Sequence, residues 1–150
     1  MKPNLRVAVF GGRKIASDIY NQALELGRLM ANEGWLVFCG GGGGAMEAVS
    51  RGVHEAGGTC IGILKGRNLS EANQWVTIPI ATGMDISRNA LLAYNCDVAI
   101  AINGSYGTLS EIAYGLQLGK PIFGLGTWEI PGVIALEHPV DIINQIKDLK

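Results

Sequence analysis

The chain has 150 residues, of which 48% are hydrophobic and 17% charged, and its formal net charge is −1. This length suits a single domain, residues 1–150, that needs no disulfides to hold its core. The balanced charge, without a Lys/Arg cluster, argues against nucleic acid as a partner. No apolar run approaches the roughly 20 residues of a spanning helix, and the N-terminus lacks a signal-peptide pattern. We therefore expect a cytoplasmic protein with no membrane partner.

The three cysteines, Cys39, Cys60 and Cys96, lie in or beside apolar runs. Such positions are typical of buried, reduced thiols and hence of a reducing compartment. The two histidines, His54 and His138, lie far apart and have no cysteine or carboxylate neighbour at metal-ligand spacing. The sequence therefore predicts no metal site.

Apolar runs alternate with segments of helical periodicity along the chain. These runs predict six strands and a short edge candidate: Arg6–Phe10, Trp35–Cys39, Thr59–Leu64, Trp75–Ile80, Val98–Ile102, Pro121–Leu125 and Val133–Leu136. Five helices are predicted between and after them: one capped by Ser17 and ended by Gly34, one from about Met46 to Ala56, then Ile86–Asn95, Thr108–Leu118 and Pro139–Leu149.

Strands that are apolar throughout and alternate with helices are typical of a parallel sheet that is covered on both faces. We therefore expect an α/β fold. It would be a single Rossmann-like domain with three layers, α/β/α, and a mainly parallel, doubly wound sheet.

A glycine turn follows three of the predicted strands, at Phe10–Arg13, Cys39–Ala45 and Asn103–Thr108. Glycine lets a ligand approach bare backbone, and a helix N-terminus offers unpaired N–H groups to an anion. Ligands of parallel sheets bind outside the carboxyl ends of the strands, where all three turns lie. The pattern predicts a phosphorylated small molecule as the ligand. We expect its contacts among Gly11, Gly12, Arg13, Gly41, Gly42, Gly43, Gly44, Met46, Arg88, Asn89, Gly104, Ser105, Tyr106, Gly107 and Thr108.

Several of these residues have two interpretations. The run Gly40–Gly44 exceeds what a tight turn needs, which favours a ligand-facing role. Arg88 begins a helix, where the dipole disfavours a cation, and this suits anion binding. The spacing of Thr108 and Glu111 matches a capping box, but it also suits a carboxylate beside a bound phosphate. Tyr106 either stacks on a planar ring or covers the turn.

A nicotinamide dinucleotide is not expected as the ligand. Its binding fingerprint requires an acidic residue about 20 residues after the glycines, at the end of the next strand. Here that strand ends in Leu64-Lys-Gly-Arg67, which is basic.

Four motifs together resemble those of the molybdenum cofactor carrier proteins: Val7–Gly12, Gly40–Met46, Thr82–Asn89 and Gly104–Glu111. That group is a branch of a Rossmann-like superfamily that also holds the LONELY GUY (LOG) phosphoribohydrolases and the DNA-binding DprA proteins. The resemblance covers nearly the whole chain, and the motifs agree in order and spacing. It implies a protein that binds molybdenum cofactor as cargo, a phosphorylated pterin whose own dithiolene holds the metal.

The resemblance to the LOG enzymes implies an alternative function. In those enzymes an arginine and a glutamate cleave the N-glycosidic bond of nucleoside 5′-monophosphates, without a cofactor, and Arg88 and Glu111 occupy the matching positions. The chain departs from the LOG pattern at three places. Asn103 replaces a proline, Ser105 replaces a glycine, and Asn89 stands where LOG enzymes typically carry lysine.

Two further interpretations are weaker. Relatives have been labelled lysine decarboxylases, but no lysine here has the context of a pyridoxal phosphate Schiff base. A DprA-like function in binding single-stranded DNA fits poorly with the mild acidity of the chain. The apolar residues Leu91, Leu92 and Tyr94 extend around more of their helix than one core-facing stripe needs, which predicts a homodimer or homotetramer.

Overall fold

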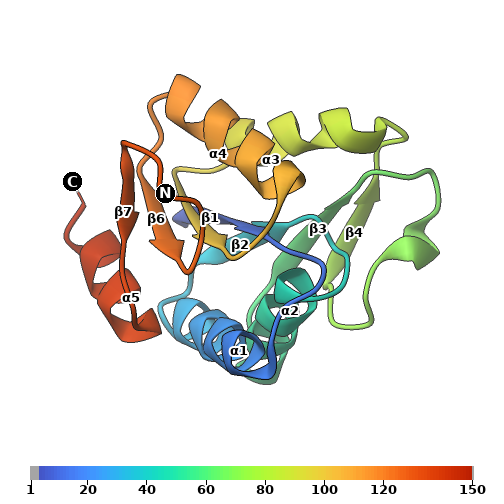
Figure 1. Cartoon of the computed structure of the whole chain (residues 1–150). Helices are drawn as coiled ribbons and strands as arrows, with labels where there is room; N and C mark the ends of the chain where they lie inside the picture. Colours follow the sequence, from blue (N-terminus) through green and yellow to red (C-terminus); the bar gives the residue numbers. More distant parts are fainter. Residues whose placement is uncertain (1–3, 150) are drawn as a thin grey trace.

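The computed structural model of the chain describes residues 4–149. Within them, seven strands form one sheet in the order β4-β3-β2-β1-β5-β6-β7, and every neighbouring pair is parallel (Figure 1). The strands are β1 (Arg6–Gly11), β2 (Leu36–Cys39), β3 (Cys60–Leu64), β4 (Ile78–Ala81), β5 (Val98–Ile102), β6 (Ile122–Leu125) and β7 (Val133–Ala135). The α-helices are α1 (Ser17–Asn32), α2 (Ala45–Glu55), α3 (Asn89–Tyr94), α4 (Tyr106–Gln117) and α5 (Pro139–Lys147). Two short 3₁₀ helices are η1 (Leu69–Glu71) and η2 (Asp85–Arg88).

The helices lie on both faces of the sheet, with α1, α2 and α5 on one face and α3 and α4 on the other (Figure 1). Strand order runs outward from β1 to β4, and the chain then returns to the other side of β1 with β5, β6 and β7. The expected Rossmann-like, doubly wound α/β fold is therefore confirmed. Strand order reverses between β1 and β5, and the crevice outside their carboxyl ends is where such sheets bind ligands.

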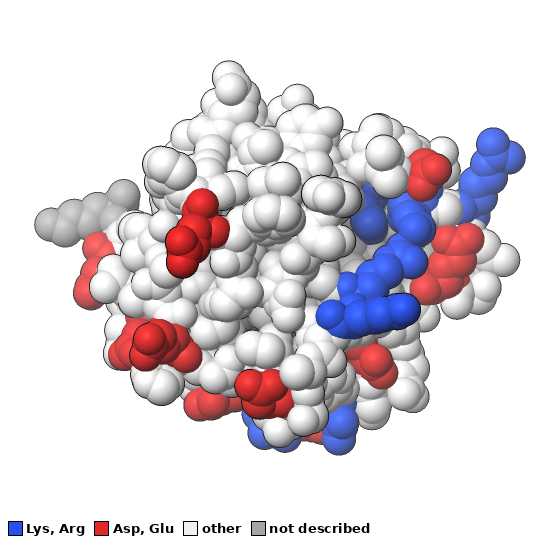
Figure 2. Space-filling view, viewed as in Figure 1, with Lys and Arg blue, Asp and Glu red and all other residues white. Residues whose placement is uncertain are grey.

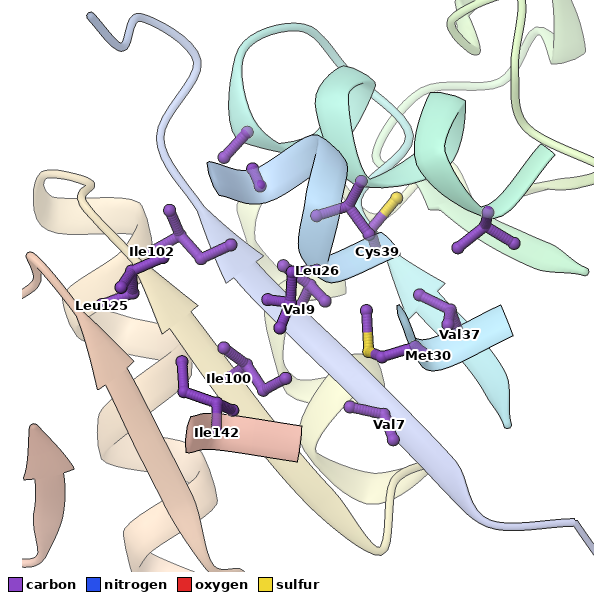
Figure 3. Packing of buried hydrophobic residues seen from close by; sticks show 14 of the residues in the cluster. Val7, Val9, Leu26, Met30, Val37, Cys39, Ile100, Ile102, Leu125 and Ile142 are labelled. Carbon is purple, nitrogen blue, oxygen red and sulfur yellow. The ribbon is translucent and has the colours of Figure 1, made fainter. Parts of the chain in front are cut away.

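The larger apolar core lies between the sheet and the α1, α2 and α5 layer. Figure 3 shows Val7 and Val9 of β1 beside Leu26 and Met30 of α1, and none of the four has exposed surface. Burial of such a side chain stabilises the fold by about 1.5–3 kcal/mol relative to leaving it in water. The strand ends that carry the glycine turns are thus held on a rigid platform.

Helices α1 and α2 pack with their backbones in contact. A Cβ atom added to Gly52 would lie 2.1 Å from Leu24 O, and one added to Gly27 would lie 2.3 Å from Val49 O. Only glycine leaves room for this approach. It brings the start of α2, and the Gly40–Gly44 turn before it, into a fixed position.

Several boundaries differ from the predictions. Ala16 is the N-cap of α1, because Ser17 already has helical backbone, and no side chain caps this helix. Trp75 precedes β4 rather than opening it, and its ring lies 5.3 Å from that of His54. The predicted helix Ile86–Asn95 divides into η2 and α3, with Arg88 at the junction.

No helix in residues 4–149 is both long and apolar enough to cross a membrane. In the same range, no three His, Cys, Asp or Glu side chains gather as a metal site. The three cysteines are buried and free, as predicted. On α3, Leu92 is buried whereas Tyr94 is 62% exposed. The homodimer or homotetramer stays a prediction.

Candidate ligand-binding site

Two adjoining cavities open at the carboxyl ends of the central strands. The first, of about 450 Å³, lies outside β1 and β5 and extends to the start of α4. It brings together most of the residues that the sequence indicated: Gly11, Gly12, Arg13, Met46, Arg88, Asn89, Gly104, Ser105, Gly107, Thr108 and Glu111. The second, of about 610 Å³, shares Arg13, Met46 and Arg88 with the first and adds Gly42 and Gly43. Gly41, Gly44 and Tyr106 line neither cavity.

The turn between β5 and α4 is held from outside by the connection after β6. Thr127 Oγ1 donates to Asn103 O at 2.8 Å, and Trp128 Nε1 donates to Ser105 O at 3.0 Å. Asn103 has a φ of +49°, and its Oδ1 accepts from the Gly104 N–H at 2.7 Å. These hydrogen bonds within the protein fix the shape of the turn.

Helix α4 begins at Tyr106, two residues earlier than predicted. Ser105 is its N-cap residue, but the Ser105 side chain makes no capping hydrogen bond. The first N–H groups of a helix have no partner within the helix, so this end can receive an anion. The predicted capping box is wrong. Thr108 is already the third helical residue, so Glu111 lies a turn too far along α4 to reach an N-cap N–H.

Glu111 is a buried carboxyl group at the wall of the first cavity, with 7% of its surface exposed. No Lys or Arg nitrogen in residues 4–149 comes within 4.0 Å of its carboxyl oxygens. Burial raises the pKa of Glu111 to about 8, although the positive charge of Arg88 opposes that rise. The carboxyl group is therefore mostly protonated at neutral pH.

Arg88 is a buried cation between the two cavities, with 8% of its surface exposed. Its Nη1 donates to Gly40 O at 2.9 Å and also to Ile63 O. Its Nε donates to Asn89 Oδ1 at 3.0 Å. Burial lowers the pKa of Arg88, but an arginine stays charged at neutral pH. The protein thus fixes two of the three guanidinium nitrogens and leaves Nη2 for a ligand.

Asn89 connects this arginine to α4. While its Oδ1 accepts from Arg88, its Nδ2 donates to Ser110 Oγ at 3.0 Å, and Ser110 Oγ donates to Gly107 O at 2.6 Å. A lysine in the place of Asn89 has donors but no acceptor. It could not accept from Arg88 Nε, so this hydrogen bond depends on having asparagine at position 89.

The Gly40–Gly44 turn is packed on most of its length. A Cβ atom on Gly40 would lie 2.8 Å from both Arg88 Nη1 and Met46 Sδ. One on Gly44, whose φ is +64°, would lie 2.3 Å from Gly12 O. Asn73 adds a clamp, because its N–H donates to Gly41 O at 2.8 Å and its Nδ2 donates to Gly42 O at 2.9 Å.

Comparison with known proteins places the chain in a family. Residues 4–148 match the model of the SLOG cluster4 family. The chain belongs to that family. The structure of the molybdenum cofactor binding protein from Rippkaea orientalis is 32% identical, with a TM-score of 0.92 over 98% of each chain. The molybdenum cofactor carrier protein from Chlamydomonas reinhardtii is 30% identical, with a TM-score of 0.87 over 96% of this chain and 97% of that one. The predicted resemblance is confirmed.

A curated relative carries the name of the alternative activity. The "probable cytokinin riboside 5′-monophosphate phosphoribohydrolase" of Oryza sativa subsp. japonica is 35% identical over 119 residues. The match covers 71% of this SLOG cluster4 chain, and the chain spans only 46% of the rice protein.

Tyr106 does not face either cavity in this SLOG cluster4 chain. It is 80% exposed, and its ring stacks on that of Trp128 with 6.3 Å between centroids and 27° between planes. Of its two interpretations, the structure favours the one in which it covers the turn.

Sequence reasoning missed four residues that line the first cavity: Lys14, Lys65, Ile86 and Asn103. Lys65 carried a usable signal, since it follows a strand directly and so lies at the carboxyl edge of the sheet. Lys14 carried a weaker one, because it adjoins Arg13 in the first glycine turn. Ile86 carried none, because its place in the wall depends on how η2 crosses the sheet edge.

Proposed function

We propose that the chain binds a phosphorylated small molecule in the first cavity, in the manner of a molybdenum cofactor carrier protein. The observation that carries the proposal is the open start of α4, whose residues Gly104, Ser105, Gly107 and Thr108 line the cavity opposite a fixed cation, Arg88. The phosphate would lie on the helix N-terminus with Arg88 Nη2 as its charge partner. The similarity to the two molybdenum cofactor proteins supports this assignment.

The cavity suits a cargo that brings its own metal ligands. Gly12 and Gly104 pack backbone against backbone at the strand ends, since a Cβ on Gly12 would lie 3.0 Å from Gly104 Cα, and both line the cavity without a side chain. Met46 adds an apolar, adaptable wall against which a ring can pack. The polar groups around it would bind the phosphate and the edge of the pterin. We propose a cytoplasmic, homo-oligomeric carrier as the setting of this function.

The decisive test is co-elution of the cargo with the protein. The purified protein is mixed with molybdenum cofactor released from a denatured molybdoenzyme, passed through a desalting column, and assayed for molybdenum. We expect retained metal in the wild type and a clear loss in Lys14→Gln, since Lys14 lines the cavity. Lys147→Gln, on α5 and outside both cavities, is the matched control and should retain it. Equal retention by all three proteins would contradict the proposal.

A second candidate function is hydrolysis of a nucleoside 5′-monophosphate, which the buried, protonated Glu111 favours. A neutral carboxyl group can donate its proton to the leaving base while water adds to the anomeric carbon as the N-glycosidic bond breaks. Arg88 would hold the nucleotide phosphate. The water's second proton would restore the Glu111 carboxyl group.

Chromatography of free base after incubation with AMP and other nucleoside 5′-monophosphates separates the two candidates. A hydrolase would release base, and Glu111→Gln would abolish the release. A carrier would bind a phosphorylated ligand and release no base.

A further inference from the structure

The second cavity has no role in the function proposed above. It lies between the Gly40–Gly44 turn, the segment after β3 and the segment before η2, and its volume is about 610 Å³. The two cavities share Arg13, Met46, Lys65 and Arg88 in their walls. A ligand bound in the first cavity can therefore extend directly into the second cavity.

Ten Lys and Arg residues lie in residues 4–149, and half of them are engaged away from the cavities. Arg28, Arg51 and Lys147 form ion pairs with glutamates. Lys120 donates to a backbone carbonyl, and Arg6 lies over an aromatic ring.

The other five all line the cavities: Arg13, Lys14, Lys65, Arg67 and Arg88. Within residues 4–149, none of the five has a carboxylate oxygen within 4.0 Å of its side-chain nitrogens. Figure 2 shows Lys and Arg gathered on the right of the view, the side of the molecule where β3 and β4 lie in Figure 1. The unpaired positive charge is thus concentrated at one place.

Carboxylates at the cavities balance only part of this charge. Glu71 and Asp85 line the second cavity, and Glu111 in the first is mostly protonated at neutral pH. Five cations therefore face two carboxylates. A single phosphate monoester carries a charge of roughly −1.5 to −2, so part of the positive charge at the cavities would stay unbalanced. A second phosphate group would balance it.

We infer that the ligand carries two linked phosphate groups, as a nucleoside diphosphate or an ester of one does. The first phosphate lies at the start of α4, and the second lies among Lys65, Arg67 and Arg88. The stem of Arg67 packs on Gly83, where an added Cβ would lie 3.3 Å from Arg67 Cγ. Arg67 is exposed and lines the second cavity, so its guanidinium can reach a phosphate bound there. The inference rests on the proposed function, because it extends the same site.

Isothermal titration with AMP, ADP, orthophosphate and pyrophosphate tests the inference at low ionic strength, where such contacts are strongest. We expect the wild type to bind ADP about tenfold more tightly than AMP, and pyrophosphate about tenfold more tightly than orthophosphate. Arg67→Gln changes only the second cavity. It should weaken the binding of ADP about tenfold and the binding of AMP less than about threefold. Lys14→Gln, which changes only the first cavity, should weaken the binding of ADP and of AMP by similar factors. Lys147→Gln controls for loss of a charge elsewhere.

Each result decides between the two proposals. Binding of AMP and ADP with equal affinity, or equal losses of both in Arg67→Gln, would overturn the second phosphate site and leave the proposed function standing. Absence of binding by all four compounds, with molybdenum cofactor still retained in the co-elution test, would overturn the second phosphate site alone. Absence of both would overturn both proposals. A preference for ADP and pyrophosphate that disappears in Arg67→Gln would support the inference.

Discussion

The two glycine turns beside the cavities, Gly40–Gly44 and Gly104–Thr108, share a sequence signature but use glycine differently. In the first turn, Gly40, Gly42 and Gly43 line the second cavity, but side-chain space is taken by Arg88 and Met46 at Gly40 and by backbone carbonyls at Gly44. In the second, four of the five residues line the first cavity; a Cβ on Gly104 would meet Thr108 Oγ1 at 2.1 Å, whereas Gly107 has no neighbour closer than 3.9 Å. The difference teaches that a glycine run can mark either a close approach of the protein to itself or an approach left for a ligand. Only the neighbours of each glycine distinguish the two.

The largest effect on stability should come from a substitution of Gly44 in the packed turn, Gly40–Gly44. Its backbone, at φ +64° and ψ −126°, lies in a region that side chains rarely adopt, and an added Cβ would meet two carbonyl oxygens at 2.3 and 2.4 Å. We expect Gly44→Ala to lower the free energy of unfolding in urea by at least about 3 kcal/mol. Gly43→Ala is the matched control, since its nearest neighbour would be 3.9 Å away, and should change stability by less than about 1 kcal/mol. Similar losses in both would show that the turn is not packed as described.

The next largest effect is on the pH dependence of stability and comes from Glu111, which follows the open turn, Gly104–Thr108. The native carboxyl group keeps its proton up to about pH 8, whereas the unfolded chain releases it near 4.3. Between these values the native state binds more protons, so the free energy of unfolding falls as pH rises, by at most about 1.4 kcal/mol per unit. Glu111→Gln should remove this decline.

Urea unfolding at pH 5, 6, 7 and 8 measures that difference at constant ionic strength. Glu25→Gln, an exposed position on α1, is the control and should run parallel to the wild type. If the Glu111→Gln profile ran parallel as well, the carboxyl group would not be held protonated in the native state.

The smallest effect on stability should come from Gly107 in the open turn. An added Cβ would have Asn89 Nδ2 as its nearest neighbour, at 3.9 Å, and the position is helical. We expect Gly107→Ala to be neutral or to stabilise the fold by up to about 1 kcal/mol. The methyl group would enter the space beside the bound phosphate, so affinity for AMP should fall. An unchanged affinity, measured by titration, would place the ligand away from this turn and remove the contrast between the two turns.

Much of the fold could be predicted because its signals are local. Each strand except β4 appeared as an apolar run whose bounds agree with the structure within a residue or two. The parallel, doubly wound character of the sheet followed from the rule that apolar strands joined by helices are covered on both faces, whereas the order of the strands came from the structure. The start of α4 was predicted two residues late because Thr108 and Glu111 imitate a cap, while the true N-cap, Ser105, makes no side-chain bond that a pattern could show.

The sequence by itself determined the Rossmann-like fold, the edge of the sheet that carries the candidate site, and the presence of both Arg88 and Glu111 at that site. Strand and helix periods, glycine turns and motif spacing are properties of neighbouring residues, so a linear pattern contains them. The tertiary structure decided which glycines are packed, that Glu111 is buried and protonated, and that Lys14, Lys65 and Arg67 meet at two cavities. Burial and charge balance depend on groups that are distant along the chain, and only folding brings these together.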